Sequence, residues 1–466
     1  MSDYLDDAQV AKQKLAQVSD SFCLAKWKQV SLHLPTGFNN SCYHPPLHKI
    51  PLEEIASNPS ALHNTSHKKL RRKEMLEGVQ CEECSYCWNI ESTGNMSDRH
   101  YRSGEPWAMQ DYDVIASSAW DSDINPSYVE VNFSHGCNLA CSYCSPQFST
   151  AWQQEIDKFG EYPTLTPHNA PEHFSGDRRN IPVRENNPYV EAFWKWWPDL
   201  YKDLKHFRMT GGEPLMDKNT YRVFDWVLDN PKPDLHLNVT SNFSVDNVLF
   251  EKYMSYVKKL CDIDEIKVEH FMQFVSIDGW GKQAEYMRDG LNFERMKHNV
   301  ERFLEEVPYR SSVTFIVTMN NLSLFSLDQL LEWIYELRGK YSKTYQRVWF
   351  DIPLLYKPVW QSLQHMPEPY AWKLEQITNG IKDRVEQGNE DHFQYFKDFE
   401  IKKFERDVAW MRQQQVSDEE IVRRKIDFYR FFSEYDRRRG LDFESTFPQM
   451  INWWNECKML SNQRGI

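Results

Sequence analysis

The hydrophobic pattern alternates between two periods through the central part of the chain. Between residues 221 and 228, and again between 293 and 307, apolar residues recur three and four positions apart, which predicts amphipathic helices. Six short segments carry the apolar runs or alternation of strands: Tyr128 to Phe133, His206 to Thr210, Leu235 to Thr240, Phe271 to Ser276, Val313 to Thr318 and Gln346 to Ile352. Strands that alternate with helices are typical of parallel sheets. The pattern therefore predicts an α/β fold of six β/α units, a partial TIM-like barrel.

The pattern changes on both sides of this region. After residue 360, charged and aromatic residues recur at helical spacing over four segments: Ala371 to Gln387, Asp391 to Gln413, Asp418 to Tyr435 and Phe447 to Met459. We therefore expect three parts, an N-terminal extension over residues 1–125, a core barrel over residues 126–360 and a helical C-terminal region over residues 361–466.

Composition and charge narrow the class of protein. A chain of 466 residues with 41% apolar and 14% aromatic content can build one large domain with appendages. The net charge of −13 opposes general affinity for nucleic acids and anionic membranes. The N-terminus has no apolar signal core, and no stretch approaches 18 apolar residues. We expect a cytoplasmic protein with no membrane partner, and nucleic acid is not favoured.

Cysteine usage points to metal. Ten cysteines in 466 residues are too few for a disulfide scaffold, and six of them form two tight groups. In the second group along the chain, Cys137, Cys141 and Cys144 have the spacing C-x3-C-x2-C directly after the first predicted strand. Thiolates are the usual ligands of [4Fe–4S] clusters, and three of them leave one iron open for chemistry. The alternative is three buried structural thiols.

This triplet, with Tyr143 inside it, resembles the cluster loop of the radical S-adenosylmethionine (SAM) enzymes. The resemblance implies a (β/α)6 barrel with its active site at the C-terminal ends of the strands. It also implies that the open iron binds the amino acid end of SAM. An electron, supplied by a flavodoxin or ferredoxin, then cleaves SAM to methionine and a 5′-deoxyadenosyl radical, which takes hydrogen from a substrate.

Polar groups at later strand ends fit the same resemblance. Gly211, Gly212 and Glu213 follow the second strand, where glycines admit close backbone approach and a carboxylate can accept from an ammonium group. Alone they would indicate only a tight turn, but they match the family's motif for the methionine amino group. Short polar residues follow the third and fourth strands and are candidates for holding ribose or carboxylate, or for capping the next helix: Thr240, Ser241, Asn242, Ser276 and Asp278.

Arg288 is a further candidate in this region. It resembles an arginine that follows the fourth strand in the peptide-modifying branch of the family, where a guanidinium can pair with a carboxylate. An ordinary surface salt bridge is the alternative.

The other cysteine group, Cys81, Cys84 and Cys87, precedes the barrel with the spacing C-x2-C-x2-C. This spacing suits an auxiliary iron–sulfur cluster or zinc, for which Cys42, His100 or another residue would add a ligand, or else the thiols are free. The layout is similar to phage and bacterial radical SAM proteins with a twitch-type domain. Twitch modules ordinarily follow the barrel, yet only Cys457 lies after residue 360, so we expect an N-terminal metal site.

Two features leave alternatives open. The insertion from Gln147 to Leu204 ends in a Trp-rich segment, which either grips substrate or forms an amphipathic helix over the barrel. Basic runs at residues 67–73, 423–425 and 437–439 either meet phosphates or form solvated helix faces.

The sequence as a whole predicts a radical SAM enzyme that abstracts hydrogen from a peptide or protein. One alternative keeps the chemistry but makes the target a nucleotide or RNA. Another is a noncatalytic iron–sulfur or zinc protein that binds a partner. The GGE turn argues against this last alternative, because a structural metal protein has no need for polar groups at successive strand ends.

Overall fold

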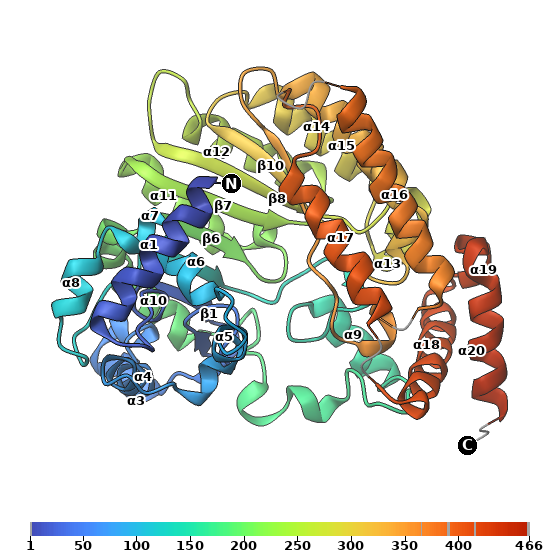
Figure 1. Ribbon diagram of the computed structural model, residues 1–466, viewed down its shortest axis with the longest axis horizontal. Helices are drawn as coiled ribbons and strands as arrows, with labels where there is room; N and C mark the ends of the chain where they lie inside the picture. Colours follow the sequence, from blue (N-terminus) through green and yellow to red (C-terminus); the bar gives the residue numbers. More distant parts are fainter. Residues whose placement is uncertain (1, 365, 389–391, 414–415, 464–466) are drawn as a thin grey trace. The chain divides into compact units, whose positions relative to one another are not determined.

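The computed structural model describes residues 2–364, 366–388, 392–413 and 416–463 (Figure 1). The chain forms two compact units that are interleaved along the sequence. The first contains Met1–Ser134, Arg179–Pro214 and Pro231–Val239, and the second contains His135–Arg178, Leu215–Asn230 and Thr240–Ile466. Each unit is described by itself, and the boundaries expected at residues 125 and 360 stay a prediction.

The first unit contains a mostly parallel sheet with the strand order β7-β6-β4-β1-β2-β3. Three of these strands were predicted, and they are observed as β4 (Tyr128–Asn132), β6 (His206–Thr210) and β7 (Lys232–Ser241). The N-terminal part adds β1 (Gln29–His33), which runs parallel to β4, and the antiparallel strands β2 (Phe38–Asn40) and β3 (His48–Lys49). The N-terminal segment therefore continues the sheet.

The Trp-rich segment forms a helix that covers this sheet. Asn187 caps the start of α10 (Pro188–Asp203), since its side chain accepts hydrogen bonds from the amides of Tyr189 and Val190. Trp197 is fully buried and packs against Phe207 of β6 with ring centroids 4.9 Å apart. The segment is thus part of the hydrophobic core, which agrees with the expectation of an amphipathic helix.

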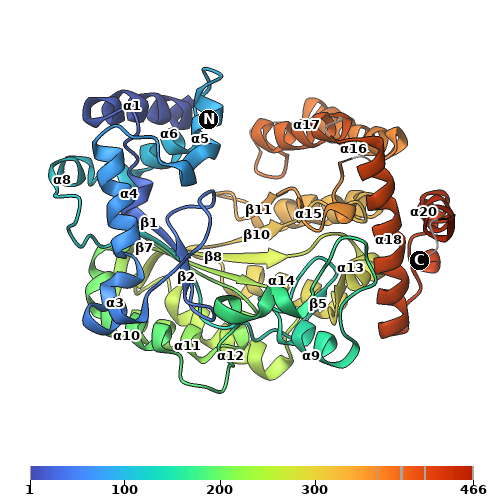
Figure 2. The same ribbon diagram turned by 90° about the horizontal axis from the view of Figure 1, so that it is seen from below.

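The remaining helices of the first unit come from the N-terminal part of the chain. They include α1 (Ser2–Val18), α4 (Ser66–Leu76), α5 (Ser85–Glu91) and α6 (Asp98–Gly104). Figure 2 shows α1 lying along α6, where the two helices pack closely.

The second unit contains the other three predicted strands, with the parallel order β11-β10-β8. They are β8 (Val268–Ser276), β10 (Ser311–Ile316) and β11 (Val348–Asp351), and a two-residue ladder joins β5 (Ala140–Cys141) to β9 (Arg288–Asp289). Amphipathic helices accompany the strands: α9 (Thr150–Phe159), α11 (Lys218–Asp229), α12 (Asn247–Leu260), α13 (Gly281–Met287), α14 (Phe293–Glu306) and α15 (Leu327–Tyr341). The fold is α/β with a mostly parallel sheet, as predicted.

After residue 360 the described chain is largely helical. The main helices are α16 (Glu368–Gln387), α17 (Asp398–Arg412), α18 (Asp418–Arg439) and α20 (Ile451–Gln463). The expected helix start at Asp391 lies outside the described residues. Figures 1 and 2 both show α16 beside α17 and α18 beside α20. None of the helices in the described ranges has the length and apolar character needed to cross a bilayer.

Several residues of the basic runs are internal. On α4, Lys68 and Arg72 are buried, where Lys68 Nζ donates to the Gln29 carbonyl at 3.1 Å and Arg72 Nη1 donates to Asn64 Oδ1 at 2.9 Å. On α18, the side chains of Arg438 and Arg439 are only 1% and 6% exposed and pair with Glu155. These four cations bind partners within the chain, which neither expectation for the basic runs had anticipated.

Candidate functional site

The loop that carries Cys137, Cys141 and Cys144 is fixed by backbone hydrogen bonds. In the β5–β9 ladder Cys141 lies opposite Arg288, and the Ser142 amide donates to the Met287 carbonyl at 2.8 Å. The Cys144 amide in turn donates to the Cys141 carbonyl at 2.9 Å. The last two thiols therefore sit on a tight turn attached to the segment after α13.

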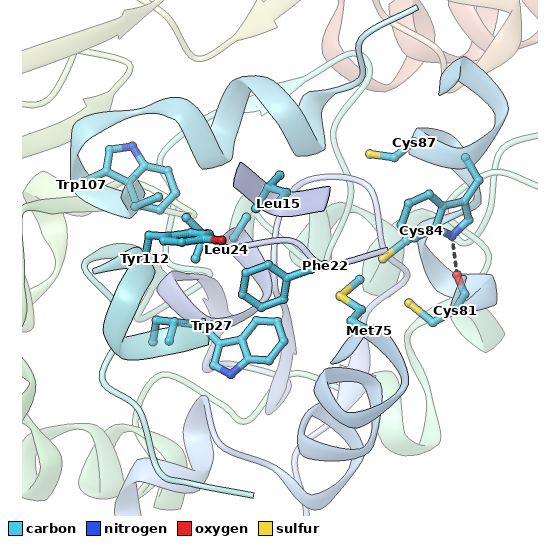
Figure 3. Close-up of a cluster of buried hydrophobic side chains, with 14 residues drawn as sticks. Leu15, Phe22, Leu24, Trp27, Met75, Cys81, Cys84, Cys87, Trp107 and Tyr112 are labelled. Atoms are coloured by element: carbon cyan, nitrogen blue, oxygen red, sulfur yellow. Dashed lines mark hydrogen bonds between the residues drawn. The ribbon is translucent and has the colours of Figure 1, made fainter. Parts of the chain in front are cut away.

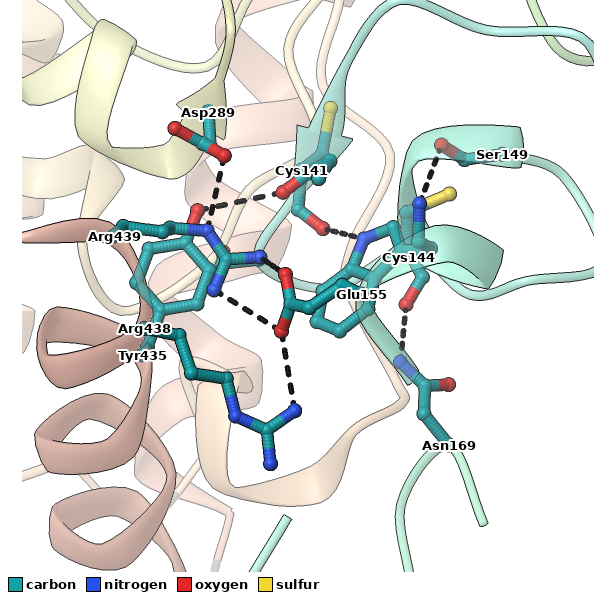
Figure 4. Close-up of polar contacts among 12 residues, drawn as sticks. Cys141, Cys144, Ser149, Glu155, Asn169, Asp289, Tyr435, Arg438 and Arg439 are labelled. Carbon is teal, nitrogen blue, oxygen red and sulfur yellow. Dashed lines mark hydrogen bonds and ion pairs between the residues drawn. The ribbon is translucent and has the colours of Figure 1, made fainter. Parts of the chain in front are cut away.

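Side chains from the insertion also hold this loop (Figure 4). The Trp152 indole donates to the Cys141 carbonyl at 2.8 Å, and Asn169 Nδ2 donates to the Cys144 carbonyl at 3.1 Å. Ser149 donates to the Leu139 carbonyl at 2.6 Å while its hydroxyl oxygen caps α9. The first half of the insertion thus supports the backbone on which the thiols are placed.

The three sulfur atoms suit a cluster better than a single ion. Cys141 is buried, and Cys137 and Cys144 are half-buried. Four sulfurs around zinc at about 2.3 Å would lie roughly 4 Å apart. Within the described chain, these three thiols do not form a group whose ligand atoms all lie within 4.8 Å of one another. A cubane binds each thiolate to a different iron and so allows wider spacing than a single zinc ion.

The electrostatics of the thiols follow from their burial. Burial, with a smaller contribution from the neighbouring Cys141, raises the pKa of Cys144 to about 12. Burial also raises the pKa of Cys141, although the Arg288 guanidinium opposes this effect. Both groups are therefore thiols at neutral pH without metal, and metal binding would release their protons.

Arg288 and Asp278 form a buried pair beside Cys141. Arg288 Nη2 donates to Asp278 Oδ1 at 2.9 Å, its Nε lies 2.9 Å from Oδ2, and its Nη1 lies 3.6 Å from Cys141 Sγ. Burial alone would lower the pKa of Arg288, but the charge of Asp278 raises it well above the usual value. This arrangement is a buried ion pair rather than the surface salt bridge considered from the sequence.

The oxygens of Asp278 are engaged within the chain. Oδ2 accepts from the Tyr143 hydroxyl at 2.7 Å, and Oδ1 accepts from the Thr318 amide at 2.9 Å as well as from Arg288. Burial raises the pKa of Tyr143 well above its usual value, so its hydroxyl is a donor at neutral pH. Three of the sequence-predicted residues, Tyr143, Asp278 and Arg288, therefore form one network with Cys141.

The polar residues after β7 shape a turn. Ser241 Oγ accepts from the Phe243 amide at 2.9 Å, and Asn242 Oδ1 accepts from the Ser244 amide at 2.8 Å. Asn242 Nδ2 donates to Asn138 Oδ1 at 2.8 Å, which connects this turn to the cysteine loop. Ser276, at the end of β8, is half-buried opposite Ile316 of β10. The structure therefore brings Asn242 to the cysteine loop.

Gly211, Gly212 and Glu213 belong to the first unit. Gly211 has φ +105°, and a Cβ there would lie 2.0 Å from Asn132 Oδ1. That oxygen is buried and has no hydrogen-bond partner among the described protein atoms. Glu213 is also buried. A side-chain-free cradle beside an unpaired acceptor and a buried carboxylate is suited to an ammonium group, which fits the role that the resemblance implies.

The N-terminal cysteines lie in a hydrophobic core of the first unit (Figure 3). Cys81, Cys84 and Cys87 are all buried, and the Trp88 indole donates to the Cys81 carbonyl at 2.8 Å. His100 is engaged elsewhere, because its Nδ1 accepts from the Ser97 amide at 3.1 Å in the capping box of α6. Of the two suggested additional ligands, Cys42 lies beside Cys84 and Cys87 on one cavity.

Sequence reasoning missed residues that support the cysteine loop from far along the chain. Gln361 binds Ser142 twice, accepting from its hydroxyl at 2.9 Å and donating to its carbonyl at 3.0 Å. Tyr435 and Arg439 of α18 contact the same region (Figure 4). No local spacing marks these residues, since each lies more than two hundred positions from the loop that it supports.

One comparison points to a class of protein. Residues 131–334 match the family model described as the Radical SAM superfamily. This match supports an enzyme of that class. The family implies a SAM-binding site and an iron–sulfur cluster. No curated protein matches the sequence.

Solved structures show a distant likeness. SuiB from Streptococcus suis bound to S-adenosylmethionine is 13% identical with a TM-score of 0.36, and the match covers 70% of this chain and 60% of that chain. SuiB bound to precursor peptide SuiA is 12% identical with a TM-score of 0.35 and the same coverage. Native anSMEcpe with bound AdoMet is 16% identical with a TM-score of 0.34, and the match covers 70% of this chain and 99% of that chain. This chain thus spans about 60% of the length of SuiB.

Proposed function

We propose that Cys137, Cys141 and Cys144 hold a [4Fe–4S] cluster with which the protein cleaves SAM reductively and abstracts hydrogen from a peptide or protein. The observation that carries this proposal is the anchored loop with three widely spaced thiols inside the segment that matches the radical SAM model. When bound, the cluster and SAM would supply an electron transfer and a 5′-deoxyadenosyl radical. A flavodoxin or ferredoxin is the proposed reductant, and the six β/α units are the proposed partial barrel.

The chain's own residues would position these groups. Glu213 and Asn132 Oδ1 would accept hydrogen bonds from the methionine ammonium, and Gly211 and Gly212 would let the backbone approach it. Ser241, Asn242 and Ser276 would hold the ribose or carboxylate. Arg288, Asp278 and Tyr143 would keep the Cys141 side of the loop in place through their buried network.

The internal basic residues support a peptide or protein substrate over RNA. Lys68, Arg72, Arg438 and Arg439 are buried and bonded within the chain, so they offer little charge to phosphates. The net charge of −13 also opposes binding to the phosphates of RNA. Among the similar structures, SuiB is bound to a precursor peptide. We place the protein in the cytoplasm, where a reducing environment would preserve the cluster.

The test is anaerobic reconstitution with iron and sulfide, reduction in the presence of SAM, and chromatographic detection of 5′-deoxyadenosine. We expect product from the native chain and none from Cys141→Ala. Cys261→Ala, which removes a buried thiol outside both cysteine groups, is the matched control and should retain product formation. A native chain with a full complement of iron that forms no 5′-deoxyadenosine, with or without added peptide, would contradict the proposal.

A further inference from the structure

Five of the ten cysteines converge in the first unit, although they are spread over 65 positions of the sequence from Cys23 to Cys87. One cavity is lined by Cys23, Cys42, Cys84 and Cys87. Cys23 follows Phe22 before α2 (Ala25–Lys28), Cys42 follows β2, and the other two come from the C-x2-C-x2-C segment. Three separate segments thus bring thiols to a single space.

The fifth thiol, Cys81, does not line this cavity. Its sulfur lies within 4.8 Å of the Cys84 sulfur, and Figure 3 shows the Cys81 and Cys84 side chains near Met75. Cys84 lies both next to Cys81 and on the cavity with Cys23, Cys42 and Cys87. The cavity therefore provides four candidate ligands without Cys81.

The spacing of these four thiols distinguishes a cluster from a single ion. The only group of three metal-binding side chains that meets a 4.8 Å limit in the described ranges is Cys81, Glu83 and Cys84. No three of the cavity thiols meet that limit, whereas the sulfurs around one tetrahedral zinc would be roughly 4 Å apart. A cluster binds each thiolate to a different iron and so allows the wider spacing.

The charged residues that line the cavity are three cations, Lys26, Arg99 and Arg102, and one carboxylate, Asp98. Each cation pairs with a carboxylate: Lys26 with Glu83, Arg99 with Glu91 and Arg102 with Glu105. A [4Fe–4S] cluster with four thiolates is anionic, so these cations would be shared between it and their carboxylates and would offset part of the cost of burying it.

The apolar side chains of the same core would shield such a group from water. Met75 and Trp88 line the cavity, and Phe22 and Leu24 belong to the same buried cluster of side chains. Burial and the hydrogen bonds around its sulfurs set the potential and the durability of an iron–sulfur centre. The cavity thus combines soft ligands with an apolar lining.

We propose that this cavity holds an auxiliary [4Fe–4S] cluster ligated by Cys23, Cys42, Cys84 and Cys87. Each thiol releases its proton to solvent as its iron–sulfur bond forms, and the iron and sulfide are supplied during assembly. Cys81 packs beside Cys84 without being a ligand. The C-x2-C-x2-C segment therefore contributes two ligands rather than three, and the other two come from distant positions.

The experiment uses the full-length chain with Cys137, Cys141 and Cys144 all changed to Ala, so that the catalytic loop binds no cluster. After anaerobic reconstitution we expect about four irons and about four sulfides per chain, with the electron paramagnetic resonance signal of a reduced cluster after dithionite. A chain that retains zinc and no iron, or no metal at all, would overturn the proposal. The result does not depend on SAM cleavage, so it is separable from the test of the proposed function.

Single substitutions on this background test the ligands. Cys23→Ala, Cys42→Ala, Cys84→Ala and Cys87→Ala should each lose most of the iron, whereas Cys81→Ala and the control Cys457→Ala should retain it. Circular dichroism and size-exclusion chromatography check that each variant folds. A variant that does not fold is replaced by the Cys→Ser variant at the same position. Loss of iron in Cys81→Ala together with retention in Cys23→Ala or Cys42→Ala would overturn the assignment.

Discussion

Arg288 and Asp278 form an ion pair that is almost completely shielded from solvent, with Arg288 Nε 2.9 Å from Asp278 Oδ2. The same guanidinium lies 3.6 Å from Cys141 Sγ, and the same carboxylate accepts from the Tyr143 hydroxyl. Two residues that the sequence suggested as separate SAM ligands are therefore partners. Their shared effect is to fix the side of the loop that carries Cys141.

Asp278→Asn removes the charge that compensates Arg288. Breaking one partner of a buried pair costs about 3–5 kcal/mol, because the other charge remains buried without compensation. We expect a lower melting temperature and fewer irons per chain after reconstitution, with the Michaelis constant for SAM little changed in the loaded fraction.

The matched control is Glu251→Gln, which breaks an exposed pair with Arg302 and should cost less than about 1 kcal/mol. If Asp278→Asn retained its iron but raised the Michaelis constant for SAM, Asp278 would be a SAM ligand. Fixing the cysteine loop would then not be its main role.

Arg439 connects α18 to the cysteine loop. It pairs with Glu155 and with Asp289 Oδ2 at 3.0 Å, and its guanidinium lies 3.6 Å from the centre of the Tyr435 ring (Figure 4). Asp289 belongs to β9, which pairs with β5 at Cys141. Arg439→Ala would leave Glu155 with Arg438 as its remaining cation and would remove the cation beside Asp289, so we expect destabilisation of about 3 kcal/mol and faster loss of iron to a chelator.

Arg437→Ala is the control for this prediction, because Arg437 is two positions away on α18 but its side chain is 61% exposed. It should change the melting temperature and the rate of iron loss only slightly. Equal effects of Arg437→Ala and Arg439→Ala on iron loss would show that α18 does not support the loop through Arg439.

The elements that could be predicted from sequence are those whose signal is local. All six predicted strands are found, because buried strands carry apolar runs that a short window detects. Strand β1 was not predicted, since Gln29–His33 contains only two strongly apolar residues and is defined by its pairing with β4. The cysteine triplets were found for the same local reason.

What could not be predicted depends on contacts between distant segments. Cys23 carries no spacing signal, and only the fold brings it to the cavity with Cys84 and Cys87. The run at residues 437–439 could not be interpreted for the same reason. Arg438 and Arg439 are buried through their pairing with Glu155, which lies more than 280 positions away. A sequence pattern identifies residue types for a site, but it does not identify partners across such separations.

Gly211→Ala tests the cradle in the first unit. The added Cβ would lie 2.0 Å from Asn132 Oδ1 and 2.2 Å from its Cγ, in a residue with φ +105°. The Asn132 side chain or the turn must therefore move, and we expect at least a tenfold loss in SAM affinity, about 1.4 kcal/mol, measured by isothermal titration of the reconstituted protein. Gly94→Ala is the control, since Gly94 has φ +84° with no atom within 4 Å of the new Cβ. Unchanged SAM affinity in Gly211→Ala would separate this turn from SAM binding.

Asp407 on α17 gives a prediction about pH. Its side chain is fully buried, Arg406 Nη2 donates to Oδ1 at 2.8 Å, and Oδ2 has no hydrogen-bond partner among the described protein atoms. Burial raises the pKa of this carboxyl to about 6, although the Arg406 charge opposes the effect. Since the folded pKa lies above the unfolded one, the contribution of Asp407 to stability is largest at low pH and is lost as the pH rises through 6.

Asp407→Asn should therefore remove part of the pH dependence. Between pH 7.5 and pH 5, we expect the native chain to gain about 1 kcal/mol of stability relative to the variant, measured as the difference in apparent melting temperature at each pH. Asp398→Asn, which alters an exposed carboxylate of the same helix, should change little with pH. If the native chain gained no stability relative to Asp407→Asn between pH 7.5 and pH 5, Asp407 would already be ionised at pH 5 in the folded state.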